Sequence, residues 1–215
     1  MKKNNFNYRL YGRSKGRKKK YNIDELYKKF KIEKINPLNY NIIDIGPGYG
    51  ESSIELAKFN KENNIIACEK YLDGIKNLLD KKQKDSLNNL FIYKGNAHQL
   101  IDEYCDDNSI SEIWVLFPDP WPKKRHFKRR LIDLLFFKKI YRILKKNASI
   151  HIASDSKSYI AEILQCVFKV KNHFLWVNQS KEEWNYSNLS LPKTKYFKKA
   201  LESGYNSFYI KLMKL

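Results

Sequence analysis

The sequence predicts an α/β fold: a mostly parallel sheet of seven strands with helices on both faces, preceded by a basic N-terminal arm. Two observations predict this class. Short apolar runs alternate with segments of helical periodicity, and a glycine-rich turn follows the first apolar run. With 215 residues the chain has the length of one large α/β domain.

Each element is expected from its own pattern. Short apolar runs, bounded by glycine, asparagine or charged residues, predict strands at residues 41–45, 65–68, 90–93, 110–117, 149–153, 174–177 and 207–212. Apolar side chains three and four residues apart predict helices at residues 23–30, 51–59, 71–80, 131–144 and 157–168. We place a boundary near Asn36 and Pro37, which separates an arm (residues 1–36) from the sheet domain (residues 37–215).

The basic residues are concentrated in two clusters. The formal net charge is +19, and a large excess of one sign on a protein of this size favours a polyanionic partner. Residues 1–20 contain nine Lys and Arg and no acid, among them Lys15, Arg17 and Lys18. The second cluster, KKRHFKRR at residues 123–130, has six basic residues in eight. We expect both clusters to contact RNA phosphates, the second through Lys124, Arg125, Lys128, Arg129 and Arg130.

Polar residues follow the first four predicted strands. In a parallel sheet the carboxyl ends of the strands meet at one edge, and ligands bind there. The first strand ends in Asp44, followed by Gly46 and Gly48 of the GPGYG turn. Glu69 follows the second strand and could accept hydrogen bonds from both hydroxyls of a ribose. Asn96 follows the third strand and suits the edge of an adenine.

Two nucleoside cofactors suit a glycine turn with an acid about twenty residues further on. The NAD fingerprint is G-x-G-x-x-G, with a pyrophosphate at a helix N-terminus. The turn here is one residue shorter than that spacing, and Asp44 suits a cationic ligand better than a pyrophosphate. The residues therefore favour S-adenosylmethionine over NAD, and an NAD-dependent oxidoreductase is the weaker alternative.

A proline-rich segment follows the fourth strand. FPDPWP at residues 117–122 surrounds one acid, Asp119, and one large aromatic, Trp121, with three prolines. Because proline fixes φ and removes a donor, this segment should be stiff. We expect it to present Asp119 and Trp121 toward the donor pocket, with the basic cluster directly after it.

These motifs together resemble a known family. FPDPWPKKRHFKRR (117–130) is similar to the signature of the bacterial tRNA (guanine-N7-)-methyltransferases, which modify a guanosine in the variable loop. DIGPGYG (44–50) resembles their methyl-donor loop and YGRSKGRKKK (11–20) a basic arm found in part of the family. HIASDSKSY (151–159) and TKY (194–196) resemble later blocks, so the similarity runs in order through nearly the whole chain.

The resemblance implies a Rossmann-like class I methyltransferase that uses S-adenosylmethionine and acts on tRNA. It implies that the methyl donor contacts Asp44, Gly46, Gly48, Glu69, Asn96 and Asp119. It implies that the substrate contacts Lys123, Asp155, Thr194, Lys195 and Tyr196. The chain departs from the family pattern twice: Asn96 stands where Asp is usual, and Phe197 stands where the last block usually has Glu.

Methylation of guanine at N7 requires little from the protein beyond alignment of the reactants. Guanine N7 has a free lone pair and no proton to lose, so a general base is unnecessary and alignment dominates. Carboxylates can accept the N1–H and N2–H₂ of guanine, and we expect Asp119 to be the catalytic residue with Asp155 beside it. The alternative is a non-catalytic RNA-binding protein on a methyltransferase fold, with Phe197 as a sign of decay.

Other classes are disfavoured by composition. No apolar run approaches the roughly 18 residues that span a bilayer, and the first residues lack the apolar stretch of a secretory signal, so we expect neither. Three widely spaced cysteines fit neither a disulfide framework nor a metal site, so we expect a cytoplasmic protein without a metal. An organellar transit peptide is the weaker interpretation of the basic N-terminus. The oligomeric state, monomer or homodimer, is left open.

Overall fold

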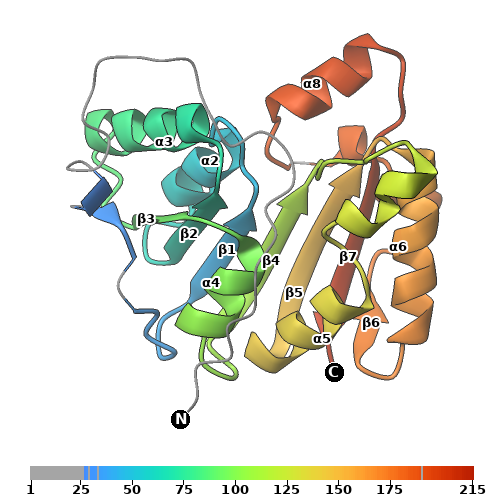
Figure 1. Cartoon of the computed structure of the whole chain (residues 1–215), viewed down its shortest axis with the longest axis horizontal. Helices are drawn as coiled ribbons and strands as arrows, with labels where there is room; N and C mark the ends of the chain where they lie inside the picture. Colours follow the sequence, from blue (N-terminus) through green and yellow to red (C-terminus); the bar gives the residue numbers. More distant parts are fainter. Residues whose placement is uncertain (1–26, 29, 33, 190) are drawn as a thin grey trace.

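The chain folds around one seven-stranded sheet in the order β3-β2-β1-β4-β5-β7-β6 (Figure 1). The computed structural model describes residues 27–28, 30–32, 34–189 and 191–215. The first five strands in this order pair in parallel, and β7 pairs antiparallel with β5 and β6. The strands are β1 Asn41–Ile45, β2 Asn64–Glu69, β3 Leu90–Lys94, β4 Ile110–Leu116, β5 Leu144–Ser154, β6 Phe174–Trp176 and β7 Phe208–Lys214.

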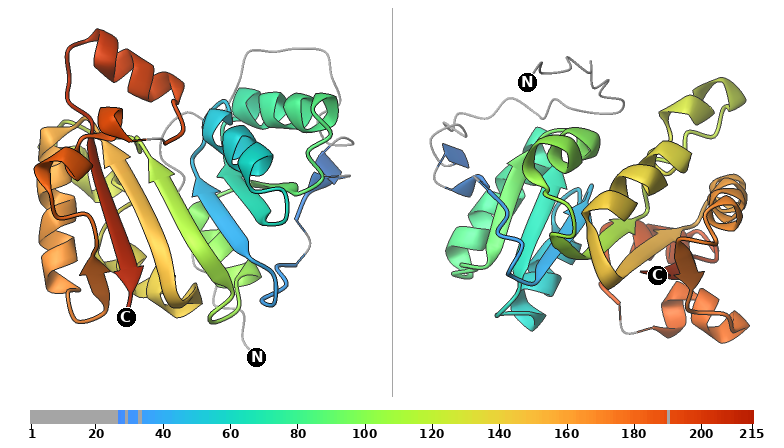
Figure 2. Two further views of the ribbon diagram at one scale, coloured as in Figure 1. Left: turned by 180° about the vertical axis from the view of Figure 1, so that it is seen from behind. Right: turned by 90° about the horizontal axis from the view of Figure 1, so that it is seen from below.

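Helices cover both faces of the sheet, as the alternating pattern predicts (Figures 1 and 2). Helices α4 (Ala97–Tyr104), α5 (Leu134–Ile143) and α6 (Lys157–Lys169) pack into the larger apolar core on one face. Helices α2 (Glu51–Phe59) and α3 (Leu72–Lys84) pack into a second core on the other face. All five residues of β1 are buried, because this strand lies in the middle of the sheet between the two cores.

A short helix, η1 (Lys124–Arg129), lies between β4 and α5. Three more short helices lie between β6 and β7, and they are α7 (Lys181–Trp184), η2 (Tyr186–Asn188) and α8 (Lys195–Glu202). Helix α8 stands above the edge of the sheet at which the parallel strands end (Figure 1). Its buried residues Phe197 and Ala200 face the protein, and Phe197 belongs to the second core.

The expected strands are all present, with ends that differ by a few residues except in β5. The predicted helix 131–144 is shorter, because Asp133 caps α5 through a hydrogen bond from the Phe136 amide (2.7 Å). At its other end the chain passes directly from Ile143 into β5, which is therefore longer than expected. Helix α4 was not predicted from the sequence, although Ala97, Leu100 and Ile101 form its buried side.

Several of the described residues before Pro37 contact the sheet domain. Lys31 forms a parallel bridge with Ile92 of the edge strand β3. Ile32 and Ile35 are buried in the larger core. The boundary at residue 36 stays a prediction, and most of the helix expected at 23–30 lies outside the described residues.

The three cysteines, Cys68, Cys105 and Cys166, are buried free thiols. Burial raises the pKa of each thiol, which keeps it protonated and unreactive. Within the part of the chain that the structure describes, no helix has the length and apolar character needed to cross a membrane.

The strand order places the functional edge. From β1 the chain runs outward to β2 and β3, then returns to β4 on the other side of β1. The loops after β1 and β4 therefore leave the sheet in opposite directions. Such loops leave an opening at the carboxyl ends of the two strands, and ligands bind there. The loops after β1, β2, β4 and β5 leave the sheet at this edge, and α8 stands above the part of it near β4 and β5 (Figure 1).

Candidate active site

The loop after β1 depends on its three glycines. Gly46, Gly48 and Gly50 have φ of +71°, +60° and +84°, which side chains rarely tolerate. Gly50 is the N-cap of α2, and a Cβ there would lie 2.2 Å from Leu78 Cδ2. The loop can therefore turn sharply from the strand into the helix and leave backbone amides at the sheet edge.

Glu69 and Gly74 hold this loop from the neighbouring elements. The Glu69 carboxylate, at the end of β2, accepts hydrogen bonds from the amides of Gly48 (2.7 Å), Lys70 (2.7 Å) and Tyr71 (2.8 Å). Burial raises its pKa, and these hydrogen bonds oppose that rise. A Cβ on Gly74, in the first turn of α3, would lie 2.0 Å from the Gly48 carbonyl oxygen. Sequence reasoning missed Gly74, since a glycine inside a helix gives no signal of a contact distant in sequence.

Asp44 is a fully buried acid with one unpartnered oxygen. Its Oδ2 accepts hydrogen bonds from the hydroxyls of Ser52 (2.5 Å) and Ser53 (2.6 Å) in the first turn of α2. Its Oδ1 is buried and has no hydrogen-bond partner among the described residues. Desolvation raises the pKa of Asp44 to about 6 against the lowering effect of the two serines. A buried acid with a vacant oxygen is suited to a cationic ligand.

Asn96 is the N-cap of α4. Its Oδ1 accepts a hydrogen bond from the His98 amide at 2.8 Å, which satisfies a donor at the start of the helix. A contact with adenine would therefore come from the amide nitrogen, which donates. This suits an adenine ring nitrogen better than the exocyclic amine.

The FPDPWP loop after β4 is held in an uncommon backbone conformation. Phe117 and Trp121 have φ of +52° and +42°, a region that costs a non-glycine residue roughly 1–2 kcal/mol. The Phe117 amide donates to the Ala153 carbonyl of β5 (2.8 Å), and its ring packs on Tyr186. Asp119 is exposed at the tip of the loop.

Trp121 packs on the basic segment. Its ring makes an edge contact with His126 at 5.7 Å, and the Arg129 guanidinium lies 4.9 Å from its centroid. The expected orientation toward the donor pocket stays a prediction. Asp155 follows β5 and is half-buried. Because Leu116 pairs with Ala153, Asp119 and Asp155 leave adjacent strands at the same edge.

The basic cluster is divided between solvent and interior. Lys123, Lys124, Arg125 and Lys128 are exposed on and before η1, where phosphates can reach them. Arg130 is only 5% exposed, and its side chain forms hydrogen bonds within the protein. The prediction that Arg130 contacts phosphate is therefore corrected. Lys15, Arg17 and Lys18 lie outside the described residues.

The block at residues 194–197 is mainly structural. Thr194 is 6% exposed and caps α8, because its hydroxyl accepts from the Phe197 amide (3.2 Å). The expected substrate contact from Thr194 stays a prediction, because its hydroxyl accepts in this cap and can still donate. The Lys195 amide donates to Glu51 at 2.5 Å and so joins α8 to the start of α2. The Lys195 ammonium is exposed and lies 5.3 Å from the Tyr49 ring.

Phe197 and Tyr196 point in different directions. Phe197 is 5% exposed and packs on Tyr186 with ring centroids 5.0 Å apart, so it fills the core. The packing of Phe197 in the core therefore explains why this chain has Phe where the family usually has Glu, without any need to assume a loss of activity. Tyr196 is 55% exposed, and its ring lies 3.5 Å from where a Cβ on Gly48 would be. Of this block, Tyr196 is thus the aromatic side chain beside the glycine loop.

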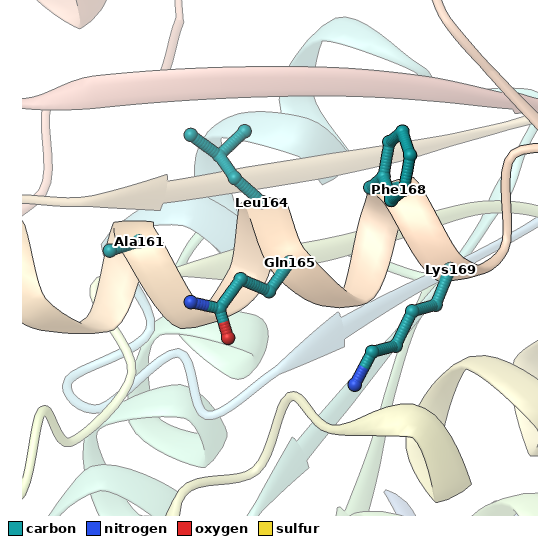
Figure 3. Close-up of a pocket in the computed structure, with 5 residues that line it drawn as sticks. All are labelled: Ala161, Leu164, Gln165, Phe168 and Lys169. Atoms are coloured by element: carbon teal, nitrogen blue, oxygen red, sulfur yellow. The ribbon is translucent and has the colours of Figure 1, made fainter.

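The surface has two hollows, one away from this edge and one beside the glycine loop, which contributes Tyr49 to it. One, of about 430 Å³, lies over the later part of α6 and is lined by Ala161, Leu164, Gln165, Phe168 and Lys169 (Figure 3). It contains none of the predicted site residues. The other, of about 600 Å³, lies between α2, α3 and α8 and contains Lys195 from the predicted set. The polar groups at the strand ends therefore define the site better than surface shape does.

Comparison with known proteins agrees with this geometry. The family described as "Putative methyltransferase" matches residues 39–210. The chain is 33% identical over 168 residues to a tRNA (guanine-N(7)-)-methyltransferase of Ruegeria sp. (strain TM1040), covering 78% of this chain and 65% of that protein. A protein of the same name from Buchnera aphidicola is 31% identical, covering 85% and 79% of the two chains. The chain spans just under two thirds of the first relative and four fifths of the second.

The chain belongs to the tRNA (guanine-N(7)-)-methyltransferase family. It is therefore an S-adenosylmethionine-dependent methyltransferase. Solved structures show the same fold. The 16S rRNA methyltransferase KamB matches with a TM-score of 0.59 at 13% identity, over 89% of this chain and 91% of that one. An rRNA methylase from Streptococcus thermophilus matches with 0.55 at 15% identity, over 90% and 93%. At these identities they establish the class I methyltransferase fold alone.

The residues at the sheet edge fit the methyl donor of this family. S-adenosylmethionine carries a positive sulfonium, and the vacant Asp44 oxygen is a buried negative group without a partner among the described residues. Asp44, Gly46, Gly48 and Glu69 lie together around the loop, and Asn96 follows β3 at the same edge. We expect these residues to hold the donor.

Replacing Asp44 should separate stability from binding. A folded pKa of about 6 against 3.8 ordinarily means that ionised Asp44 costs stability, and this cost develops as pH rises from about 4 to about 6. Asp44→Asn keeps an acceptor for Ser52 and Ser53, so it should stabilise the ligand-free protein at pH 7.5 by about 1–3 kcal/mol. It should also weaken binding of S-adenosylmethionine.

Thermal unfolding and calorimetric titration of the same samples check both effects. The exposed Asp80 on α3 provides the control, and Asp80→Asn should change neither quantity. If Asp44→Asn destabilises the protein, the ionised carboxylate does not cost stability. If the variant binds the donor as tightly as the wild type does, the buried charge does not contribute to donor binding.

Gly74→Ala should weaken donor binding although alanine favours helices. At an ordinary helical position this change stabilises by about 0.5–1 kcal/mol. Here the methyl group would meet the Gly48 carbonyl at 2.0 Å and displace the loop. Overpacking of roughly 1–3 kcal/mol corresponds to a donor affinity about five- to a hundredfold lower. Calorimetry with Asp80→Ala as the helix control tests this, and unchanged affinity would show that the loop does not rely on Gly74.

Proposed function

We propose that this chain transfers the methyl group of S-adenosylmethionine to N7 of a guanosine in the variable loop of tRNA. The observation that carries this proposal is the segment 117–130, in which a stiff loop with an exposed acid leads directly into an exposed basic helix. The relatives from Ruegeria and Buchnera carry this activity in their names. We also propose that the protein acts in the cytoplasm, as the buried free thiols favour.

The donor supplies an activated methyl group on a sulfonium, so the protein has to orient the nucleophile. Guanine N7 attacks with its own lone pair, and no proton has to leave it. Alignment of the two reactants alone can contribute roughly 7–11 kcal/mol. No general base is needed, and the exposed carboxylate of Asp119 is free for a different task.

Asp119 and Asp155 are suited to hold the base. A carboxylate can accept hydrogen bonds from guanine N1–H and N2–H₂, and it stabilises the positive charge that develops on the base. The two acids follow the paired ends of β4 and β5, one at a loop tip and one half-buried. In this proposal Asp119 is the catalytic residue and Asp155 a second contact to the base.

Tyr196 offers a stacking surface for the same base. Its ring is 55% exposed and lies beside Gly48 in the donor loop. Proteins usually recognise single-stranded RNA bases by stacking on aromatic side chains and by contacts to the base edges. Tyr196 would bring the flipped guanine next to the donor loop, while the acids read its edge.

The exposed cations of the basic cluster are suited to bind tRNA phosphates. Lys123, Lys124, Arg125 and Lys128 lie on or next to η1, which directly follows the Asp119 loop. Phosphate contacts set the orientation of a nucleic acid on a protein without reading its sequence. We further expect Lys15, Arg17 and Lys18 to add phosphate contacts from the N-terminal arm.

The proposal is tested by incubating the purified protein with labelled S-adenosylmethionine and a tRNA transcript. The methyl group is then mapped by strand scission at N7-methylguanosine. A transcript with adenosine in place of the variable-loop guanosine is the matched control. Label at that guanosine, and none in the control, is expected. Label at another base, or donor binding without transfer, would contradict the proposal.

Mutation should separate chemistry from phosphate binding. Asp119→Ala should lower the single-turnover rate by roughly 10²–10³, the effect of losing one preorganised contact, and leave tRNA affinity nearly intact. Lys128→Ala should instead weaken tRNA binding and flatten the slope of log K against log [salt] by about 0.7–0.9. Its turnover at saturating tRNA should change less than its KM.

Salt-dependent binding and single-turnover rates of both variants make the comparison. The assignment fails if Asp119→Ala loses tRNA binding while it keeps its rate.

A further inference from the structure

Arg130 is the last residue of the basic cluster, and its side chain is 1% exposed. Its Nε donates to the Pro120 carbonyl (2.9 Å), and its Nη2 donates to the Ser158 hydroxyl (2.9 Å). Its Nη1 donates to the Ser158 carbonyl (3.3 Å) and forms an ion pair with Glu162. A phosphate could not reach this guanidinium without displacing these partners.

Two aromatic rings also lie against the guanidinium. The Phe127 ring centroid lies 3.6 Å from the Arg130 Cζ, and the Tyr159 centroid lies 4.8 Å from it. Arginine presents a planar fork of five donors and stacks on aromatic rings, which a lysine ammonium cannot do. The surroundings therefore require the shape of arginine rather than its charge, which Glu162 neutralises.

The partners of Arg130 belong to the two segments that carry the acids. Pro120 lies directly after Asp119 in the strained loop between Phe117 and Trp121. Ser158, Tyr159 and Glu162 lie on the first turns of α6, which begins two residues after Asp155. One guanidinium thus connects the loop that carries Asp119 with the helix that follows Asp155.

We propose that Arg130 is a positioning residue that fixes Asp119 relative to Asp155, and that it does not bind phosphate. This inference rests on the proposed function, because the two acids hold the guanine there. Without the bond to its carbonyl, Pro120 would no longer be tied to α6, and Asp119 would shift with it. Displacements of about 1 Å at a reacting group can cost on the order of a hundredfold in rate.

Arg130→Lys keeps the charge but loses the fork, and Lys128→Ala removes an exposed cation of the same cluster. Arg130→Lys should lower the single-turnover rate by about 10- to 100-fold and leave the salt slope of tRNA binding as in the wild type. Lys128→Ala should flatten that slope by about 0.7–0.9. A third variant, Arg130→Met, removes the charge and should also leave the salt slope as in the wild type. A phosphate ligand at residue 130 would instead flatten the slope in Arg130→Met, as Lys128→Ala does.

A double-mutant cycle tests whether Arg130 acts through Asp119. In the Asp119→Ala background Arg130→Lys should cause little further loss of rate, since the group that it positions is absent. A merely structural role would produce additive losses, together with a lower donor affinity and a lower Tm. Additive losses at unchanged salt slope would overturn the positioning role.

Glu162→Gln provides a milder variant if Arg130→Lys folds poorly. It keeps an acceptor for Nη1 and removes only the ion pair, so the rate should fall less, with the same unchanged slope and the same dependence on Asp119. A rate equal to that of the wild type in Glu162→Gln, with Arg130→Lys unfolded, would overturn the proposal. If the wild-type protein does not methylate tRNA, the proposed function fails as well, whereas an active wild type with additive losses contradicts the Arg130 inference alone.

Discussion

The buried charge of Asp44 is the constraint from which the donor end of the site follows. A carboxylate without solvent must be stabilised by hydrogen bonds or by a cation. Ser52 and Ser53 supply two hydrogen bonds to one oxygen, and no described residue donates to the other. They can reach Asp44 only because α2 begins directly over the end of β1, which the positive φ of Gly50 allows. The glycine loop therefore places the two serines that stabilise Asp44, in addition to any contact that it makes with a ligand.

The substrate end depends on a second buried charge, that of Arg130. Here each of the three side-chain nitrogens has an acceptor, among them the Glu162 carboxylate, and two aromatic rings lie against the guanidinium. The two charges differ in a way that matters for function. Asp44 lacks one partner among the described residues, as expected for a group that awaits a cationic ligand. Arg130 has a partner at each side-chain nitrogen, as expected for a group that holds other residues in place.

Features that depend on a few neighbouring residues could be predicted from the sequence. The buried run at β1, the glycines after it and the acid at the end of β2 each follow from a few neighbouring residues, and the structure brings them together. The basic cluster was also found, but six cations in eight residues do not reveal which one turns inward. Arg130 and Thr194 point into the protein because of partners on α6 and at the start of α8, which no local pattern shows.

Contacts between different segments of the chain also explain why the roles of Gly74 and Phe197 could not be predicted from the sequence. Gly74 matters through contact with Gly48, and Phe197 matters through packing on Tyr186. Both contacts join segments distant in sequence. The turn-to-helix transition at Asn96 was interpreted as a ligand contact, while the side chain also caps α4. Capping residues and ligand residues are of the same types, so position at a strand end cannot distinguish them.

Proton release on donor binding tests the role of Asp44 most directly. Calorimetric titration of the wild-type protein with S-adenosylmethionine, in buffers of different ionisation enthalpy, measures the protons exchanged on binding. With a pKa of about 6 in the free protein, Asp44 is half protonated at pH 6, and a cationic donor should release about half a proton there. At pH 8 it should release almost none, and the Asp44→Asn variant should show no such release at pH 6. Proton uptake at pH 6, or the same release from Asp44→Asn, would contradict the account.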